Sequence, residues 1–504
     1  MAILTRKSVL AVVKETTEGT PVKPTAGTDY VALQPDFIIT PSQESLTNDE
    51  IRDSIGIAKP IPGIKTPTAT GSHYLRASGV EGQAPGYSPF LEACFGSVTV
   101  ASTEYTLDPG STTTTLQFQV GEAVNFQRGQ AVLIKDAVNG YSIRALDSVD
   151  TGADTAELSF ALDAAPASGV ALGKATLYKP EDENHPTLSL WHYLGNGGTI
   201  NLMSGSRVTD ASTTITAGQL INTSYSFEGL DYYQNPLCVD ATNDTLDWTD
   251  DAGTFQITVP QKVYAKPNEL ACTIQDAMNA ASTETFTVTY SNSTGKFTFA
   301  TDTSVVFSLL WDSGAGNAVT IGDLLGFDTA TDDTGATSYD GDGPIDLASP
   351  YTISLDDADP LVAKNMQVLC GDQADNMCVK ASEMTFGKAL TRAQILSLCA
   401  KTGVDSSVIS ERAVSVSITS LLNHYDVDKY CRWVEATDTR MEVNFGEKDK
   451  SGNWVPGKCG AAYIPTGVIT GVEQADQDGF VAVTVTGAAF VNKNGDGEVY
   501  MNFL

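Results

Sequence analysis

The apolar and polar residues of this chain follow one order of predicted elements, and that order occurs twice. The first copy runs through residues 72–76, 87–95, 187–193 and 219–229. The second copy runs through residues 414–418, 426–436, 441–445 and 479–490. Alternating apolar and polar residues predict a strand with one buried face, and the second segment of each copy has helical spacing. The pattern predicts two related β modules, each with a flanking helix. The alternative is two similar modules by chance, because the copies share few identical residues.

The helices are predicted from apolar spacing and from capping residues. In the second copy, Tyr430, Trp433 and Val434 fall on one helical face, and Asp426 precedes them as a candidate N-cap. A further helix is predicted at residues 391–401, where Thr391 and Gln394 have the spacing of a capping box. Its apolar residues are expected to lie in a core, and they are Ile395, Leu396, Leu398 and Cys399.

Two stretches of different texture are predicted as inserted domains. Residues 98–180 contain regular short strands bounded by turn residues, which is typical of a small β-barrel or sandwich. Residues 240–345 contain an amphipathic helix at 268–281 and a hairpin at 285–300, which is typical of a small α+β module. The chain is mainly β, and 504 residues are enough for three or four domains. We expect four parts: a discontinuous first module (1–97 and 181–239), a β insert (98–180), an acidic α+β insert (240–345) and a second module (346–504).

The segment at residues 55–70 is predicted to be an extended arm. It contains Pro60, Pro62 and Pro67, so it is neither a helix nor a central strand. Its apolar residues are Ile57, Ile61 and Ile64. These side chains favour packing against a neighbouring molecule, and a solvated loop is the alternative.

Charge and cysteine content restrict the classes of function. The net charge of -32 argues against a surface that neutralises nucleic-acid phosphates. An acidic wall still suits a conduit that must not hold DNA, and the alternative is solubility alone. The eight Cys show no repeated pair spacing and are expected to be reduced, mostly buried thiols of a protein made in a cytosol. The sequence shows no signal peptide and no membrane span.

No motif for catalysis or metal binding stands above background, so we expect no enzyme, no cofactor and no metal. The four His lack metal-ligand spacing. Gly452 to Cys459 has the spacing of a phosphate-binding loop, but Cys replaces the magnesium ligand and extended chain follows, which favours a hairpin turn. Residues 492–497 resemble half an EF-hand loop, but Phe503 stands where the bidentate Glu belongs. A glycan hydrolase needs only two placed carboxylates, so it stays an alternative.

The pieces that stand out resemble the tail-tube (major tail) proteins of long-tailed, non-contractile bacteriophages. The likeness lies in Leu10 to Pro24, the arm region 49–71, the helix region 86–96, residues 205–229, and in the second half 452–458 and 474–490. Residues 268–327 resemble an accessory module of such proteins. The likeness lies in the pattern of residue types over most of the chain, without an invariant catalytic motif.

The resemblance implies a β-sandwich with a flanking helix, and rings of such modules that stack into a tube conducting DNA during ejection. A closed ring removes free strand edges, and stacking is an open-ended contact that makes a filament. With two tube modules per chain, three chains would make a pseudo-sixfold ring. With one module per chain, six chains would be needed, and three is favoured.

The implied partners are further copies of the chain, the tail terminator, tape-measure and tail-tip proteins, and DNA that passes without specific binding. No membrane is implied, and the location is the virion after synthesis in the host cytoplasm. Residues Ile57, Pro60, Ile61, Pro62, Ile64 and Pro67 are the candidate inter-ring contact. A secreted or surface-displayed β-rich adhesin or lattice protein is the alternative.

Overall fold

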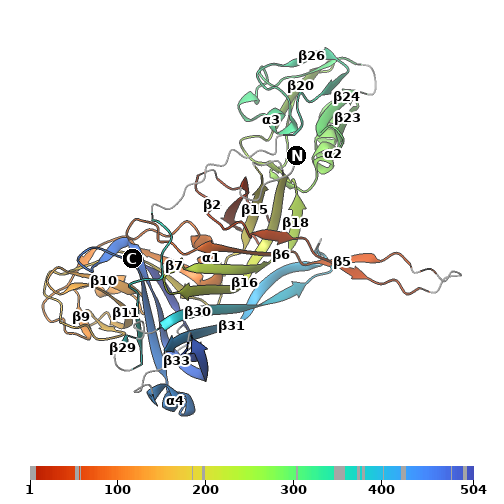
Figure 1. Ribbon diagram of the computed structural model, residues 1–504. Coiled ribbons are helices and arrows are strands. Elements are labelled where there is room, and N and C mark those ends of the chain that lie inside the picture. Colours follow the sequence, from red (N-terminus) through yellow and green to blue (C-terminus); the bar gives the residue numbers. More distant parts are fainter. Residues whose placement is uncertain are drawn as a thin grey trace. The chain divides into compact units, whose positions relative to one another are not determined.

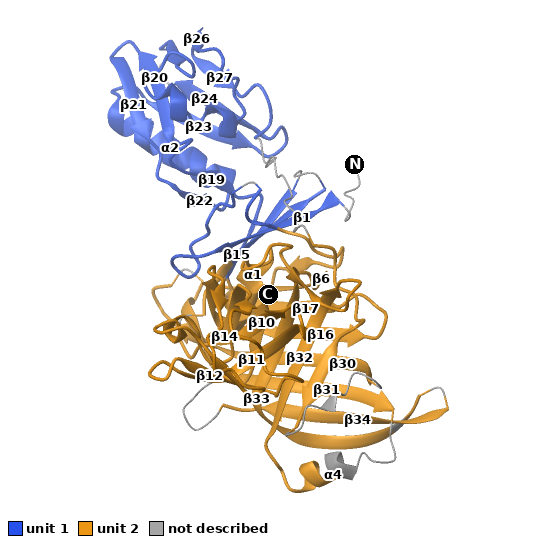
Figure 2. Ribbon diagram, turned by 90° about the vertical axis from the view of Figure 1, so that its left-hand side faces the viewer, with its two compact units in different colours: residues 1–30, 189–205, 231–352 blue, residues 31–188, 206–230, 353–504 orange. Residues whose placement is uncertain are grey.

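The fold is described from a computed structural model. It describes residues 7–25, 27–50, 56, 58–183, 185–195, 199–301, 305–345, 358–371, 375–376, 381–400, 402–421, 427–477, 479–491 and 497–504, without the side chains of 375–376, 427–430 and 475. Contacts divide the chain into two compact units (Figure 2). Unit 1 comprises residues 1–30, 189–205 and 231–352, and unit 2 comprises residues 31–188, 206–230 and 353–504. This division differs from the four-part division expected from sequence, because the chain passes between the units several times.

Unit 1 contains two hydrophobic cores. The first lies among strands β1 (Val9–Lys14), β15 (Leu188–Leu194), the start of β16 (Thr199–Thr216) and β18 (Asp231–Gln234), and it is built around Trp191 and Tyr193. The second lies between residues 237 and 345. Its elements are β19 (Leu237–Val239), β20 (Thr245–Asp250), β21 (Gly253–Thr258), β22 (Lys262–Tyr264), α2 (Pro267–Ala281), β23 (Phe286–Ser291), β24 (Lys296–Thr301), β25 (Phe307–Leu309), α3 (Gly322–Leu325), β26 (Asp333–Ala336) and β27 (Ser338–Asp340).

The predicted helix and hairpin of the second insert are confirmed. Helix α2 buries Leu270, Ile274 and Met278, which share one face because they are spaced by four residues. Strands β23 and β24 pair from Phe286↔Thr301 to Ser291↔Lys296. The apolar periodicity was sufficient here because helix and hairpin are local structures whose partners are close in sequence.

Unit 2 contains a six-stranded sheet formed by the first insert. Its order is β8 (Tyr105–Thr106), β13 (Ala171–Leu172), β10 (Ala131–Asp136), β11 (Gly140–Asp150), β12 (Thr155–Leu158) and β9 (Thr115–Gln117). Leu116, Val132 and Leu146 are fully buried in its core. The flanking strands β7 (Gly96–Ala101) and β14 (Ala175–Pro180) pair with each other, and β14 also pairs with β35 (Tyr500–Phe503).

The rest of unit 2 contains two sets of strands, each of which begins with a hairpin, continues with a helix and ends with a pair of antiparallel strands. Set 1 comprises β3 (Ile38–Thr40), β4 (Gln43–Leu46), β5 (Ile61–Lys65), β6 (Thr68–Tyr74), helix α1 (Ser88–Phe95), β16 and β17 (Asn222–Glu228) (Figure 1). Set 2 comprises β30 (Ala381–Leu396), β31 (Val404–Leu421), helix α4 (Val427–Val434), β32 (Thr439–Lys448), β33 (Trp454–Gln477) and β34 (Phe480–Ala489). Strand β28 (Gln367–Cys370) pairs with β32 on one side and with β29 (Asp375–Asn376) on the other.

The two sets agree in register, residue by residue. The pair Ile38↔Thr70 in set 1 corresponds to Thr385↔Ser417 in set 2, so both strands are displaced by 347 positions. In the last two strands of each set, a register shift between Val208 and Asp210 of β16 corresponds to one between Ile469 and Gly471 of β33. A bulge inserts one extra residue, so it shifts the pairing of every later residue on that strand relative to its partner strand. A bulge at the same place in both sets is therefore a specific likeness between them.

The prediction of a helix at residues 391–401 is wrong. Residues up to Leu396 belong to strand β30, which pairs with β31 as far as Leu396↔Val404. Ile395, Leu396 and Leu398 are not core residues, because their exposed fractions are 47%, 64% and 106%. The apolar spacing was local, whereas the pairing partner lies beyond a turn, and strand pairing overrides helix propensity.

Helix α4 is present, and two of its apolar side chains are partly exposed. The exposed fractions of Trp433 and Val434 are 38% and 64%. The candidate N-cap Asp426 lies outside the described residues, and so does the side chain of Tyr430. Helix α1, by contrast, buries Phe90, Leu91, Cys94 and Phe95. Apolar side chains on an exposed helix indicate a surface that another partner covers.

His73 makes the stability of unit 2 depend on pH. The imidazole lies on the core side of β6, and its ring centroid is 4.1 Å from that of Tyr87 and 5.5 Å from that of Tyr225. Burial lowers the pKa of His73 to about 4. Between the ordinary pKa of 6.5 and pH 4 the unfolded chain binds a proton that the folded chain excludes. We expect the free energy of unfolding to fall by about 3 kcal/mol as the pH drops through this range. Urea unfolding at pH 7 and pH 4.5 checks this; His73→Gln should lose less stability, and an equal loss would contradict the assignment.

Candidate assembly surfaces

A seam between β16 and β30 joins the two strand sets into one sheet. The strands pair antiparallel from Asp210↔Ala389 to Thr216↔Glu383, and the Ala217 N–H donates to the Ser382 carbonyl at 2.9 Å. The next-to-last strand of set 1, β16, therefore pairs with the first strand of set 2, β30. The chain thus contains one complete example of how one set attaches to another.

One face of this joined sheet is apolar and the other is polar. Directly opposed residues share a face. The core face includes the row Ile215, Met384, Ile418, Val485 and Val472. On the other face one row is Asn222, Thr214, Thr385, Ser417 and Thr486, and the next is Thr216, Glu383, Thr419, Thr484 and Glu473. These two polar rows contain hydroxyl, amide and carboxylate groups and no Lys or Arg.

A buried lysine reinforces the core side of the seam. Lys388 lies opposite Ala211, is 5% exposed, and its Nζ stands 4.1 Å from the centroid of the Phe95 ring at the end of α1. Burial lowers the pKa of Lys388. A cation over an aromatic face is stabilised by the ring's quadrupole. Set 2 thereby covers the last turn of the helix that belongs to set 1.

Two hairpin arms extend from the sheet, one from each set. Arm 1 comprises β4 and β5, with pairs Ser45↔Pro62 and Leu46↔Ile61. Arm 2 is the far part of β30 and β31, and the corresponding pairs, Arg392↔Ile409 and Ala393↔Val408, occur in the same register. In Figure 1 arm 1 extends beyond β6. Sequence analysis predicted arm 1 but missed arm 2, whose strand pattern was interpreted as a helix.

The predicted arm residues divide between the arm and its base. Ile61, Pro62 and Ile64 lie in β5, and Pro60 immediately precedes that strand. The exposed fraction of Ile61 is 52%, and that of Leu46 opposite it is 45%. Pro67 is buried at the base, where its carbonyl accepts a hydrogen bond from Gly229 N at 2.8 Å. Ile57 lies outside the described residues. The segment is therefore one strand of a hairpin rather than a single extended arm.

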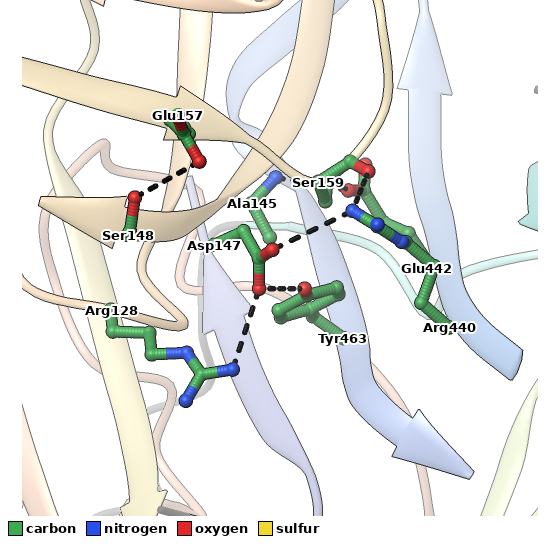
Figure 3. A network of polar contacts seen from close by, with 9 residues as sticks. All are labelled: Arg128, Ala145, Asp147, Ser148, Glu157, Ser159, Arg440, Glu442 and Tyr463. Carbon is green, nitrogen blue, oxygen red and sulfur yellow. Dashed lines mark hydrogen bonds and ion pairs between the residues drawn. The ribbon is translucent and has the colours of Figure 1, made fainter. Parts of the chain in front are cut away.

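A buried polar network attaches the first insert to set 2 (Figure 3). Glu442 of β32 is fully buried and accepts hydrogen bonds from Ala145 N at 3.0 Å, from the Ser159 hydroxyl and from Asn444 Nδ2 at 2.8 Å. Ala145 and Ser159 belong to the insert. A single buried carboxylate thus satisfies donors of the insert and of β32, and it connects the insert to the second strand set.

Asp147 provides a second connection in the same network. Its carboxylate accepts a hydrogen bond from the Tyr463 hydroxyl at 2.8 Å and lies 3.4 Å from Arg128 and 3.5 Å from Arg440 (Figure 3). Burial, together with the charge of Asp147, raises the pKa of Tyr463, so its hydroxyl stays protonated and keeps donating. Residues from the insert and from β32 and β33 thus meet at one carboxylate.

The metal-binding and phosphate-binding motifs considered from sequence can be compared with the described residues. Among them, no group of three or more His, Cys, Asp or Glu side chains is placed to hold a metal ion. The loop-like motif at 452–459 is a turn followed by strand β33, which confirms the hairpin interpretation. Residues 492–496 lie outside the described part.

The expectation of mostly buried thiols is wrong, because Cys272, Cys399 and Cys431 are exposed. No helix in the described ranges has the length and apolar character to cross a membrane.

The distinctive surfaces of the described residues are sheet edges, arms and a polar sheet face. A family model described as phage tail tube protein matches residues 5–259, just over half of the 504 residues. The chain belongs to this family and is a structural protein of the phage tail tube. The predicted family and the mainly β fold are confirmed.

Three of the solved structures that match part of this chain do so with low identity and low TM-scores. One is a virion of a native gene transfer agent particle, with 12% identity and a TM-score of 0.20 over 25% of this chain and 90% of that chain. Another is the tail of an empty gene transfer agent particle, with 14% identity and a TM-score of 0.19 over the same shares. A third is the Hcp1 protein of the E. coli EAEC 042 pathovar, with 8% identity and a TM-score of 0.17 over 27% and 95%. No curated protein matches the chain.

Proposed function

We propose that three copies of this protein form each ring of a non-contractile phage tail tube, with two strand sets from each chain. The observation that supports this proposal is the β16–β30 seam, which already joins two sets of equal register within one chain. Three chains then supply six sets to one closed sheet. Closure leaves no free strand edge, which is the physical advantage of a ring over an open sheet.

The polar face of the joined sheet is the proposed wall of the conduit. Its rows carry Ser, Thr, Asn and Glu side chains, such as Thr385, Thr419 and Glu473. Hydroxyl groups offer no net charge to phosphates, and carboxylates repel them, so DNA passes without being held. The apolar face then packs against the outer layer of the ring.

Arm 1 is the proposed contact between stacked rings. The exposed apolar side chains of Leu46 and Ile61 suit burial against another copy, and Pro60 and Pro62 limit strand pairing along β5. The ends of the tube would contact tail terminator, tape-measure and tail-tip proteins in the virion after synthesis in the host cytoplasm.

Subunit counting tests the ring stoichiometry. Native mass spectrometry of assembled rings should give three chains, and negative-stain microscopy should show hollow, regularly striated tubes. Rings of six chains would hold twelve strand sets and would contradict the proposal. Flat sheets, or monomers alone, would favour the adhesin or lattice alternative.

A further inference from the structure

We propose that neighbouring copies in a ring are joined by a strand seam in which β33 of one copy pairs antiparallel with β3 of the next. The register is that of the intramolecular β16–β30 seam. This inference rests on the proposed ring, and it names the edges and the residue pairs that close it. Its partner is a second copy of this chain.

The correspondence between the sets identifies the two edges. Strand β33 corresponds to β16, because both carry the register shift at the same place against β34 and β17. Strand β3 corresponds to the part of β30 at residues 385–387, because Ile38↔Thr70 corresponds to Thr385↔Ser417. A seam between β16 and β30 within the chain therefore has a counterpart between β33 and β3 of two chains.

The register follows directly from the same correspondence. Ser212 lies opposite Gly387 in the intramolecular seam. Through the shared bulge Ser212 corresponds to Glu473, and through the matched hairpins Gly387 corresponds to Thr40. Glu473 of one copy should then face Thr40 of the next. The neighbouring pairs are Gln474 with Ile39 and Ala475 with Ile38.

Both edges have an open side in the part of the chain that the structure describes. Beyond Gly467, β33 pairs with β34 alone, and β3 pairs with β6 alone. Strand β3 extends over only three residues, whereas the corresponding strand β30 is continuous through its pairing with β16 and β31. A strand with one neighbour has half of its backbone groups unpaired, and a second neighbour extends it.

Apolar side chains gather beside both open edges. Ile38 on β3 is 58% exposed, and Trp433 and Val434 in the last turn of α4 are 38% and 64% exposed. The Trp433 Nε1–H donates to the Thr470 carbonyl at 3.1 Å, which places this turn beside β33. In the intramolecular seam, the last turn of α1 is covered by Lys388, and Phe95 is 6% exposed. The next copy would cover the last turn of α4 in the same way.

The composition of the β3 edge fits a contact that forms only during assembly. Pro35 corresponds to Ser382, which lies just beyond the paired part of β30, and Pro41 corresponds to Lys388, which lies opposite Ala211 inside the paired part. Proline lacks the backbone donor but keeps the carbonyl, and Ser382 uses its carbonyl to accept from Ala217 N. Prolines and short length protect an edge strand against uncontrolled pairing. The proposed register also places no two carboxylates directly opposite each other, since Asp36 faces Gln477 and Glu473 faces Thr40.

Disulfide trapping tests the seam. The hydrogen bond between Ala217 and Ser382 makes Ser212 and Gly387, and hence Glu473 and Thr40, a pair without mutual hydrogen bonds. The Cα atoms of such pairs lie about 4.5 Å apart, which suits a disulfide. We expect the Thr40→Cys/Glu473→Cys variant, assembled and then oxidised, to give dimer and trimer bands on a non-reducing gel. The bands should disappear on reduction.

Matched variants make the result specific. Thr214→Cys/Thr385→Cys tests the intramolecular seam and should bridge within one chain. Thr40→Cys/Gln477→Cys is out of register by about 13 Å and should stay unbridged. Each single variant and the unmodified chain measure bridging by native cysteines. Rings seen by microscopy without the Thr40/Glu473 bridge, or with equal bridging out of register, would overturn the seam but leave the tube function standing. Absence of rings from the unmodified chain would overturn the proposed function and the seam together.

Discussion

Replacing residues 45–62 of arm 1 by a short turn should leave a folded, soluble protein that no longer forms tubes. The removed part of β4 and β5 pairs only with itself, and its apolar side chains Leu46 and Ile61 are about half exposed. Removing exposed residues costs the fold little, whereas a stacking contact loses the apolar surface that it would bury. Thermal unfolding followed by circular dichroism measures the first effect, and tube length in negative-stain images measures the second.

Point variants separate the apolar contact from the shape of the arm. Ile61→Ser keeps the hairpin and removes one exposed apolar side chain, so it should shorten tubes without preventing ring formation. Val138→Ser is the matched control, because Val138 is 90% exposed in a turn of the first insert, away from both arms. Tubes of ordinary length from the shortened-arm protein would refute the stacking role, and equal effects of the two point variants would show a general loss of solubility.

Glu442→Ala should destabilise unit 2 by about 3–5 kcal/mol, since it removes a buried charge that satisfies several buried donors. The N–H of Ala145, the Ser159 hydroxyl and the Asn444 amide would lose their common acceptor. Urea unfolding gives the free energy. Limited proteolysis should also cut the first insert sooner, because the insert would be held less firmly against β32.

Glu157, a carboxylate of the first insert, provides the matched control for Glu442. Glu157→Ala removes an exposed carboxylate whose contact is a 3.4 Å hydrogen bond from Ser148 (Figure 3). Its effect should stay within about 0.5 kcal/mol, as for other exposed positions. If Glu442→Ala costs no more than Glu157→Ala, the network does not hold the insert in place.

Local periodicity predicted the elements whose partners are near in sequence. Helix α2, the hairpin of β23 and β24, and helix α1 lie within a residue or so of the predicted bounds. The order strand, helix, strand and closing strands was also visible twice. These features depend on side chains a few residues apart, so sequence spacing describes them well.

Long-range pairing accounts for the failures. Leu396 pairs with Val404 in a hairpin, and the apolar spacing that suggested a helix there was incidental. Glu442 had no signal in the sequence, because its donors lie nearly 300 positions earlier in the insert. The burial of Pro67 and the exposure of Trp433 likewise depend on which strands lie beside them.

The sequence by itself determined that this is a mainly β, acidic protein in which the same order of predicted elements occurs twice. It also indicated the tail-tube family, which the family comparison confirms. Only the tertiary structure decided that the two strand sets share one register and one bulge, that they join through β16 and β30, and that β3 and β33 present the corresponding edges. The physical reason is that periodicity reports which face of a strand is buried, whereas register and edges depend on hydrogen bonds between residues far apart in the chain.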